Sequence, residues 1–243
     1  MSNKKTILIT APYFPPYGGG LERYALEMSR MFSKEYNVVV VTSGEWFGDD
    51  SLEHQGDIKI HRLSYNIKIC NTPFSFKWFR KVRKIIKNEK PSLINIHMPV
   101  PGIGDIAFLL SRGIPKVVTY HSGSIGKGFS IWTIFTYIYE RFFLSYFLAR
   151  SKKIICSSDY IRYGFLKRYM YKSITVTPGV DVSRFYPNPS LKTEYTSLLF
   201  VAGLGKTETY KGLSTLIEAV RDIVKVNTDL VLNVVGDGDM REE

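Results

Sequence analysis

The run Thr6-Ile-Leu-Ile-Thr10 is followed by Ala11-Pro-Tyr-Phe-Pro-Pro-Tyr-Gly-Gly-Gly20 and then by the amphipathic stretch Leu21–Phe32. A short β-branched run, a glycine turn and an apolar stripe at helical spacing predict a strand that passes directly into a helix. The alternation returns along the chain, with strands expected at Asn37–Thr42, Ile58–Leu63, Leu93–His97, Lys116–His121, Lys153–Ser157 and Ile174–Thr177 and helices at Phe76–Asn88, Ile103–Ser111, Ile131–Ala149 and Asp159–Arg168. Apolar strands separated by helices predict an α/β, Rossmann-like parallel sheet with helices on both faces.

The alternation is interrupted at the linker-like segment Tyr186-Pro-Asn-Pro-Ser190. A second unit begins beyond it, with a strand expected at Ser197–Ala202, a helix at Gly212–Val224 and a strand at Leu230–Val235. Two strands and one helix do not close a core of this class unaided. We therefore predict a first domain over residues 1–188 and an incomplete second Rossmann-like domain over residues 189–243.

The 243 residues have a formal net charge of +11, which is unevenly spread. Residues 1–190 contain 27 Lys and Arg against 13 Asp and Glu, whereas residues 191–243 contain six against nine. The excess predicts an anionic partner for the first domain, either nucleic acid, anionic lipid or a phosphorylated sugar substrate. The two cysteines, Cys70 and Cys156, have neither a disulfide nor a metal-ligand pattern, and Pro12 and Pro15 follow the first apolar run too closely for a signal peptide. A reducing, cytoplasmic compartment is expected.

Two features predict a binding site. The glycines of Pro15-Pro-Tyr-Gly-Gly-Gly-Leu-Glu-Arg23 let a backbone approach a ligand, and a helix start presents unpaired N–H groups to an anion. A tight strand-to-helix turn is the alternative, and the spacing does not fit the G-x-G-x-x-G dinucleotide fingerprint. His97 and His121 end two predicted strands, and ligands of such sheets bind outside the carboxyl ends of strands. Both histidines are therefore expected at a cleft, with His121 the stronger candidate.

Several short motifs follow one another along Ile7–Met240. They are Gly19-Gly-Leu-Glu-Arg23, Thr119-Tyr-His121, Cys156-Ser-Ser-Asp159, Thr177-Pro-Gly-Val-Asp181 with Phe185 and Pro187, Tyr210-Lys-Gly-Leu213 and Val235-Gly-Asp-Gly238. The first resembles the G-G-x-E-R motif of glycosyltransferase family 4, and the fourth resembles that family's P-x-G-V-D-x-x-x-F-x-P crossover. Each motif is weak alone, but their order and spacing together are specific to this family.

The resemblance implies a GT-B fold, in which the first domain binds the acceptor and the second binds a nucleotide-sugar donor. It also implies retention of anomeric configuration without a bound metal or other cofactor. By this resemblance His121 would be the catalytic residue that touches the transferred sugar. The donor phosphates would be contacted by Gly19, Gly20, Lys211 and Lys206, and the acceptor side would include Glu22 and His97. A lysine at a helix start suits the negative charge that develops on a leaving diphosphate.

Two departures from the family pattern affect the donor side. Gly203 stands where the family usually has an arginine, and the family's E-x7-E segment is expected well after Gly238, where this sequence has only five more residues. We therefore expect no measurable sugar transfer by this chain alone. The main hypothesis is a glycosyltransferase of cell-envelope or capsule polysaccharide synthesis with a lipid-linked or polysaccharide acceptor. The alternative is a non-catalytic acceptor- or membrane-binding fragment of a split glycosyltransferase, completed by a companion chain.

Two stretches of the first domain predict contact with an anionic membrane surface. Phe76–Asn88 has an apolar stripe beside a basic face, which fits either a helix lying on a bilayer or a core helix with a solvated face. Phe129–Leu148 contains nine aromatic residues, and Glu140 and Arg141 at its centre exclude a membrane-spanning helix. We expect peripheral attachment to the inner face of the cell membrane. Nucleic acid is not an expected partner, because the aromatics lie in apolar runs without a recognisable nucleic-acid-binding module.

Overall fold

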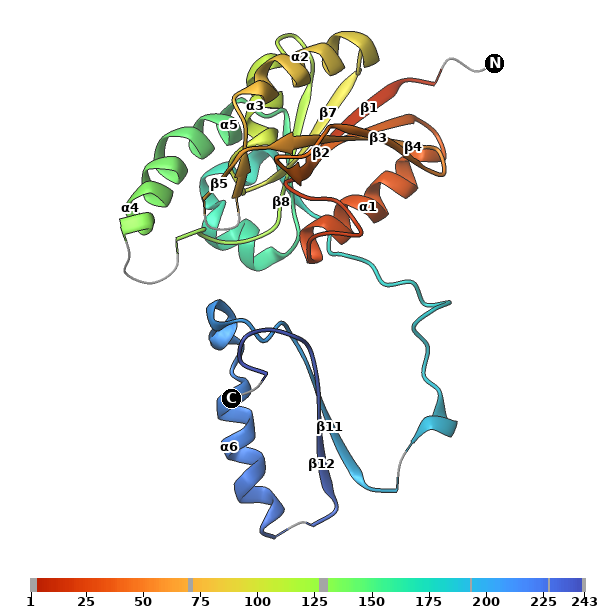
Figure 1. Ribbon diagram of the computed structural model, residues 1–243, viewed down its shortest axis with the longest axis vertical. Coiled ribbons are helices and arrows are strands. Elements are labelled where there is room, and N and C mark those ends of the chain that lie inside the picture. The colour runs from red at the N-terminus through yellow and green to blue at the C-terminus, as the bar shows by residue number, and fades with distance from the viewer. Residues whose placement is uncertain (1–3, 70–71, 127–130, 193, 227, 242–243) are drawn as a thin grey trace. The chain divides into compact units, whose positions relative to one another are not determined.

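The computed structural model describes residues 4–69, 72–126, 131–192, 194–226 and 228–241. The chain forms two compact units, Met1–Gly179 and Val180–Glu243, and each contains a parallel sheet (Figure 1). The division falls before the predicted linker at Tyr186–Ser190. Every residue from 176 to 192 is exposed, which is the exposure expected of a connection between domains.

The sheet of the first unit is built from β1 Thr6–Thr10, β2 Asn37–Trp46, β3 Ser51–Gln55, β4 Ile58–Tyr65, β7 Leu93–Met98, β8 Lys116–Tyr120, β9 Lys153–Cys156 and β10 Ser173–Thr175. Within the described residues these eight strands lie in the order β10-β9-β8-β7-β1-β2-β4-β3. Neighbouring strands are parallel except for β3 and β4, which confirms the predicted α/β sheet. A separate hairpin joins β5 (Ile67–Ile69) and β6 (Thr72–Phe74).

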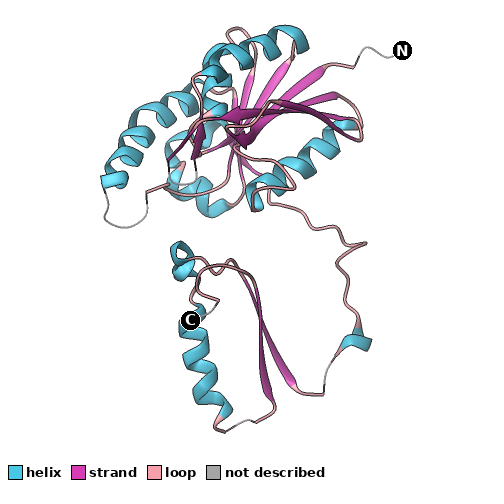
Figure 2. Ribbon diagram, viewed as in Figure 1, coloured by secondary structure: helices cyan, strands magenta, loops and turns pink. Residues whose placement is uncertain are grey.

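Helices cover both faces of this sheet (Figure 2). Their bounds are α1 Gly20–Ser33, α2 Lys77–Glu89, α3 Ile103–Leu110, α4 Ile131–Ile138, η1 Tyr139–Leu144, α5 Ser145–Arg150, η2 Ile161–Phe165 and η3 Lys167–Lys172. Successive side chains of a strand point to opposite faces, so each strand contributes to two cores. Ile7 and Ile9 pack in one core with α1, whereas Leu8 packs in the larger core with α2, α3 and α5.

The apolar stripe of α2 belongs to the larger core. Trp78, Val82 and Ile85 are buried there, and Trp78 Nε1 donates a hydrogen bond to the Ser64 carbonyl at 2.8 Å. The basic side chains lie toward solvent, and Lys81 Nζ pairs with an Asp50 carboxylate oxygen at 2.6 Å. The structure thus decides between the two interpretations of this stretch. It is a core helix with a solvated basic face.

The sequence prediction missed the strand β3, because all five of its residues are exposed and its sequence has no apolar alternation. The helical segment expected at Asp159–Arg168 is confirmed, as a helical start at residues 159–160, the π turn η2 and the beginning of the 3-10 segment η3, with an interruption at Leu166. The helix expected at Ile131–Ala149 is confirmed as α4, η1 and α5, while Phe129 lies outside the described residues. No helix in the part of the chain that is described is long and apolar enough to cross a bilayer.

Arg62 on β4 connects the unpredicted strand to the loop before the glycine turn. Its Nε lies 2.9 Å from both carboxylate oxygens of Glu53 on β3. Its two terminal nitrogens donate to the carbonyls of Phe14 and Pro15 at 3.0 and 2.6 Å. Arg62 is 6% exposed, so these charge-assisted bonds lie in a region with little competing water. The guanidinium therefore fixes the path of the chain from β1 toward α1.

The second unit consists of η4 Pro189–Leu191, β11 Thr196–Val201, η5 Lys206–Lys211, α6 Leu213–Val224 and β12 Leu230–Val235. Among its described hydrophobic residues, Leu204 and Leu230 are the buried ones. Leu199 and Val201 are each 67% exposed, although both lie in a strand. Apolar strand residues of this kind are normally covered in parallel sheets. The described part of this unit therefore leaves one face of its sheet uncovered, the face that carries Leu199 and Val201.

We predict that Arg62→Met weakens the first unit without changing its fold. The substitution leaves the Phe14 and Pro15 carbonyls without their donors, and we expect the free energy of unfolding to fall by about 2–3 kcal/mol. Because the Glu53 side chain is 46% exposed, this figure counts the carbonyl bonds rather than the ion pair. In urea titrations, the control Arg30→Met, at an exposed ion pair with Glu27, should lose less than about 1 kcal/mol. Equal losses for the two variants would contradict the role given to Arg62.

Candidate functional site

The candidate site lies at the carboxyl edge of the first unit's sheet. β1 is flanked by β2 on one side and by β7 on the other, so the strand order changes direction at β1. The connection after β1 leads to β2, and the connection after β7 leads to β8 on the opposite side. The two connections diverge and open a crevice at this edge, where ligands of such sheets bind. The glycine turn follows β1, His97 is in β7, and His121 follows β8 directly.

His97 and His121 are in direct contact. His97 Nδ1 lies 2.8 Å from His121 Nε2, and the rings stack with centroids 4.9 Å apart and planes 20° from parallel. Tyr24 of α1 packs edge-on against His121 at a centroid distance of 5.0 Å. His97 is 1% exposed, whereas His121 is partly exposed. A ligand at this edge would therefore contact His121, with His97 beneath it.

Burial also determines the protonation state of the two histidines. Burial lowers the pKa of His97 well below its ordinary value, and the neighbouring His121 lowers it further. Burial lowers the pKa of His121 to about 4. Both rings are consequently neutral at neutral pH, and one of the two facing nitrogens carries the proton that joins them. His97 Nε2 is buried and has no hydrogen-bond partner within the described residues.

His97 is buried in this structure, and its place on the acceptor side stays a prediction. Its neighbours on the same face are also polar. One residue pair further from the edge, Asn95 Nδ2 donates to Thr119 Oγ1 at 3.0 Å. This face of β7 and β8 carries polar residues joined in cross-strand pairs, while the opposite face carries Ile96 and Val118 in the larger core. Within this unit, His97 thus holds the His121 ring in place through the contact between their ring nitrogens.

Glu22 is likewise occupied within the protein. Its Oε2 accepts a hydrogen bond from the Gly19 N–H at 2.7 Å, and its side chain is buried at the start of α1. The carboxylate caps the helix, and the Gly19 N–H is no longer open to a phosphate. Gly18 must be a glycine, because its φ is +99° and a Cβ there would lie 2.4 Å from Glu22 Cγ. Gly20 has open space around the position of a Cβ, so a ligand can approach the helix start at that point.

Two further residues shape this edge. Asp105 in α3 is half-buried, accepts bonds from the Gly102 N–H and the Tyr139 hydroxyl at 2.9 Å each, and has its pKa raised by burial to about 7. Glu140 accepts bonds from Ser124 Oγ at 2.9 Å and from the Ile125 N–H at 2.5 Å. These bonds attach the loop after His121 to η1. Sequence reasoning missed both roles, although an Asp three residues after Gly102 is a capping pattern.

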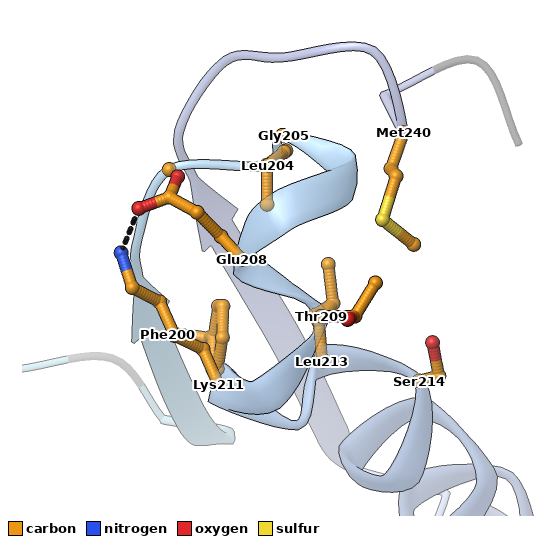
Figure 3. A pocket seen from close by; sticks show the side chains of 10 residues that line it. Phe200, Leu204, Gly205, Glu208, Thr209, Lys211, Leu213, Ser214 and Met240 are labelled. Atoms are coloured by element: carbon orange, nitrogen blue, oxygen red, sulfur yellow. Dashed lines mark hydrogen bonds and ion pairs between the residues drawn. The ribbon is translucent and has the colours of Figure 1, made fainter. Parts of the chain in front are cut away.

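The second unit holds the two predicted phosphate-binding lysines. Lys211 Nζ pairs with Glu208 Oε1 at 2.7 Å, and Figure 3 shows the pair at the wall of a small pocket that Ser214 and Thr209 also line. The pair raises the pKa of Lys211. A Cβ on Gly203 would lie 1.8 Å from Glu208 Oε2, so the carboxylate fills the space beside the glycine that replaces the family's arginine. Lys206 begins η5 and is not among the residues that line this pocket.

The structure brings together the predicted residues of the first unit, Gly19, Gly20, Glu22, His97 and His121. Lys206 and Lys211 belong to the other unit, and a common site with His121 stays a prediction. Within the described ranges, no three His, Cys, Asp or Glu side chains gather as a metal would require.

We predict that the buried histidine makes stability pH-dependent. The unfolded chain binds a proton at His97 below about pH 6.5, whereas the folded chain does not, so stability falls as the pH drops. The expected slope is about 1.4 kcal/mol per pH unit for His97. His97→Gln should flatten the dependence of the unfolding free energy on pH between about pH 7 and 5, measured in urea. An unchanged slope in the variant would contradict this assignment.

Comparison with known proteins identifies relatives of this chain. The family model for Glycosyltransferase Family 4 matches residues 18–184. A D-rhamnosyltransferase of Pseudomonas aeruginosa is 27% identical over 191 residues, which are 76% of this chain and 46% of that protein. A phosphatidyl-myo-inositol mannosyltransferase of Mycolicibacterium smegmatis is 26% identical over 96% of this chain and 59% of its own length. The chain thus spans about half the length of the curated relatives it matches.

Solved structures show the same fold at low identity. A sucrose-phosphate synthase from Thermosynechococcus elongatus aligns over 96% of this chain and 71% of its own, with a TM-score of 0.58 and 14% identity. An α,α-trehalose-phosphate synthase from Burkholderia vietnamiensis aligns over 98% and 64%, with a TM-score of 0.59 and 11% identity. These neighbours have the GT-B fold. Since the family model covers more than half of the sequence, the chain belongs to glycosyltransferase family 4.

Proposed function

We propose that this protein takes part in the transfer of a sugar from a nucleotide-sugar donor, with retention of configuration, to a lipid-linked or polysaccharide acceptor of the cell envelope or capsule. The observation that supports it most is the partly exposed His121, stacked on the buried His97 at the carboxyl edge of the first unit's sheet. The named relatives are a rhamnosyltransferase and a phosphatidyl-myo-inositol mannosyltransferase, which favours a hexose donor and a membrane-linked acceptor.

His121 would act in this reaction as a neutral hydrogen-bonding group. With its pKa lowered to about 4, the ring is not a proton donor at neutral pH in the way an imidazolium is. The bond to His97 fixes the plane of the ring, and Tyr24 covers one edge. A ring held in one orientation can accept or donate a bond to a sugar hydroxyl without reorganising as the reaction proceeds.

In the second unit, Lys211 would bind the donor diphosphate, and in the first unit the N–H groups at the start of α1 near Gly20 offer a position for an anion. In this proposal a lysine, and no metal ion, supplies the charge opposite the leaving diphosphate. Glu208 is the obstacle, since it pairs with Lys211 and would have to give way to a phosphate. We therefore expect weak donor binding by the 243 residues.

A second function is favoured by the uncovered sheet of the second unit. Leu199 and Val201 are exposed there, so the described part of the donor unit lacks the packing that would hold a site rigid. On this alternative the protein binds the acceptor and the membrane without catalysis, and a companion chain covers the donor unit. Attachment to the inner face of the cell membrane is part of both proposals, whereas nucleic acid is a partner in neither.

Transfer assays with a panel of nucleotide sugars distinguish the two functions. We expect no measurable transfer by the 243-residue chain alone. A chimaera whose residues 180–243 are replaced by the full donor domain of the D-rhamnosyltransferase should transfer sugar. His121→Ala should then reduce kcat by about 100-fold, as expected for a lost group that stabilises the transition state. His54→Ala, at an exposed histidine of β3, is the control and should keep the rate.

Either of two outcomes would contradict the proposed site. One is a His121→Ala chimaera as active as the control. The other is robust turnover by the 243-residue chain that is lost in Lys211→Ala, because the donor unit would then be complete enough to act.

A further inference from the structure

Among the described residues, the helix formed by α4, η1 and α5 has an exposed apolar face, and Figure 1 shows it as a continuous run of helix on the outside of the first unit. Leu144, Phe147 and Leu148 point into the core. The exposed face carries Ile134, Phe135, Tyr137, Ile138, Phe142, Phe143 and Tyr146. Each of these seven side chains is at least 43% exposed. An apolar patch of this size on a protein surface marks a contact with a partner or a membrane.

The π-helical segment η1 sets which residues lie on that face. Tyr139 and Leu144 are five residues apart, and both pack against the core. In a regular α-helix, inward residues recur every three or four positions. The one-residue insertion of a π turn shifts the register. It thereby leaves Phe142 and Phe143 outside.

A groove with two arginines lies beside the aromatic face. Its volume is about 480 Å³, and its walls come from the helix and from η3. Arg141 and Tyr146 line one wall, and Arg168 and Tyr171 line the other. The Tyr169 hydroxyl donates to the Ser145 carbonyl at 3.2 Å and joins the walls.

The charged residues that line the groove are Arg141 and Arg168. The surrounding segment 139–175 contains eight Lys and Arg against two acids, Glu140 and Asp159. Both acids are engaged elsewhere, Glu140 with the loop after His121 and Asp159 with the Thr175 hydroxyl at 2.5 Å. Among the described residues, no carboxylate forms an ion pair with Arg141 or Arg168. The Arg141 guanidinium instead lies 5.9 Å from the centre of the Phe142 ring.

We propose that this groove binds the phosphate of an anionic glycerophospholipid while the aromatic face lies in the interfacial layer of the bilayer. Guanidinium groups match the oxygens of a phosphate, and aromatic side chains beside them are typical of the boundary between headgroups and acyl chains. The arginines favour an anionic partner over an uncharged one, and the exposed aromatic face beside them favours a bilayer over an acidic protein surface. The proposal extends the membrane attachment of the proposed function by naming its site.

The position of the aromatic face fits the membrane-linked acceptor of the proposed function. The helix begins after β8, at the carboxyl edge of the sheet, and ends before β9, at the opposite edge. The uncovered face thus starts at the edge where His121 lies. α2 offers no comparable site, since its Trp78, Val82 and Ile85 are in the core.

Co-sedimentation of the intact chain with vesicles tests the proposal. Phosphatidylcholine vesicles with and without phosphatidylglycerol are compared for wild type and Arg141→Gln/Arg168→Gln. Because the double variant loses two basic groups near an anionic surface, its affinity for the anionic vesicles should fall by about 30-fold. The matched control Arg80→Gln/Arg83→Gln removes the same charge from the solvated face of α2 and should stay within about 3-fold of wild type. Phe142→Ser/Phe143→Ser should weaken binding to both kinds of vesicle.

Equal losses for the two arginine pairs would overturn the groove as a site, since only general charge would then matter. So would an oligomer that forms without vesicles and is abolished by Phe142→Ser/Phe143→Ser, which would assign the face to self-association. If the double groove variant does not fold, Arg168→Gln alone is compared with Arg80→Gln on the same terms. Vesicle binding needs no sugar, so a failure of the proposed sugar transfer leaves this result unaffected.

Discussion

The parallel pairing of β1, β7 and β8 is the constraint on which the site depends. Parallel strands end at the same edge, so the glycine turn after β1, His97 in β7 and His121 after β8 are brought together from distant parts of the sequence. Both faces of such a sheet are buried, and a polar residue there needs a partner. On one face, the cross-strand pairs Asn95–Thr119 and His97–His121 supply partners, although His97 Nε2 has none among the described residues.

Other polar side chains hold the loops at this edge in place. Arg62 fixes the carbonyls before the glycine turn, Glu22 caps α1, and Glu140 attaches the loop that follows His121. These bonds connect the first unit's candidate site to β4, α1 and η1. A substitution at Arg62 can therefore change ligand binding through the loop rather than through direct contact.

Much of the fold was predictable because buried parallel strands are short β-branched runs, as in Thr6–Thr10 and Asn37–Thr42. The exposed edge strand β3 gave no such pattern, and with it the Arg62–Glu53 pair was missed. Both histidines were found at their strand ends, but only the register showed that one covers the other. The internal bonds of Glu22 and Glu208 were not predicted, because a motif does not reveal whether a carboxylate is already engaged within the protein.

A crystal structure of the protein with a nucleotide sugar tests the central claim most directly. The account predicts the sugar within hydrogen-bonding distance of His121, close to the backbone at Gly20, with His97 making no contact with the ligand. A sugar bound elsewhere in the first unit, with the His121 ring unoccupied, would contradict it.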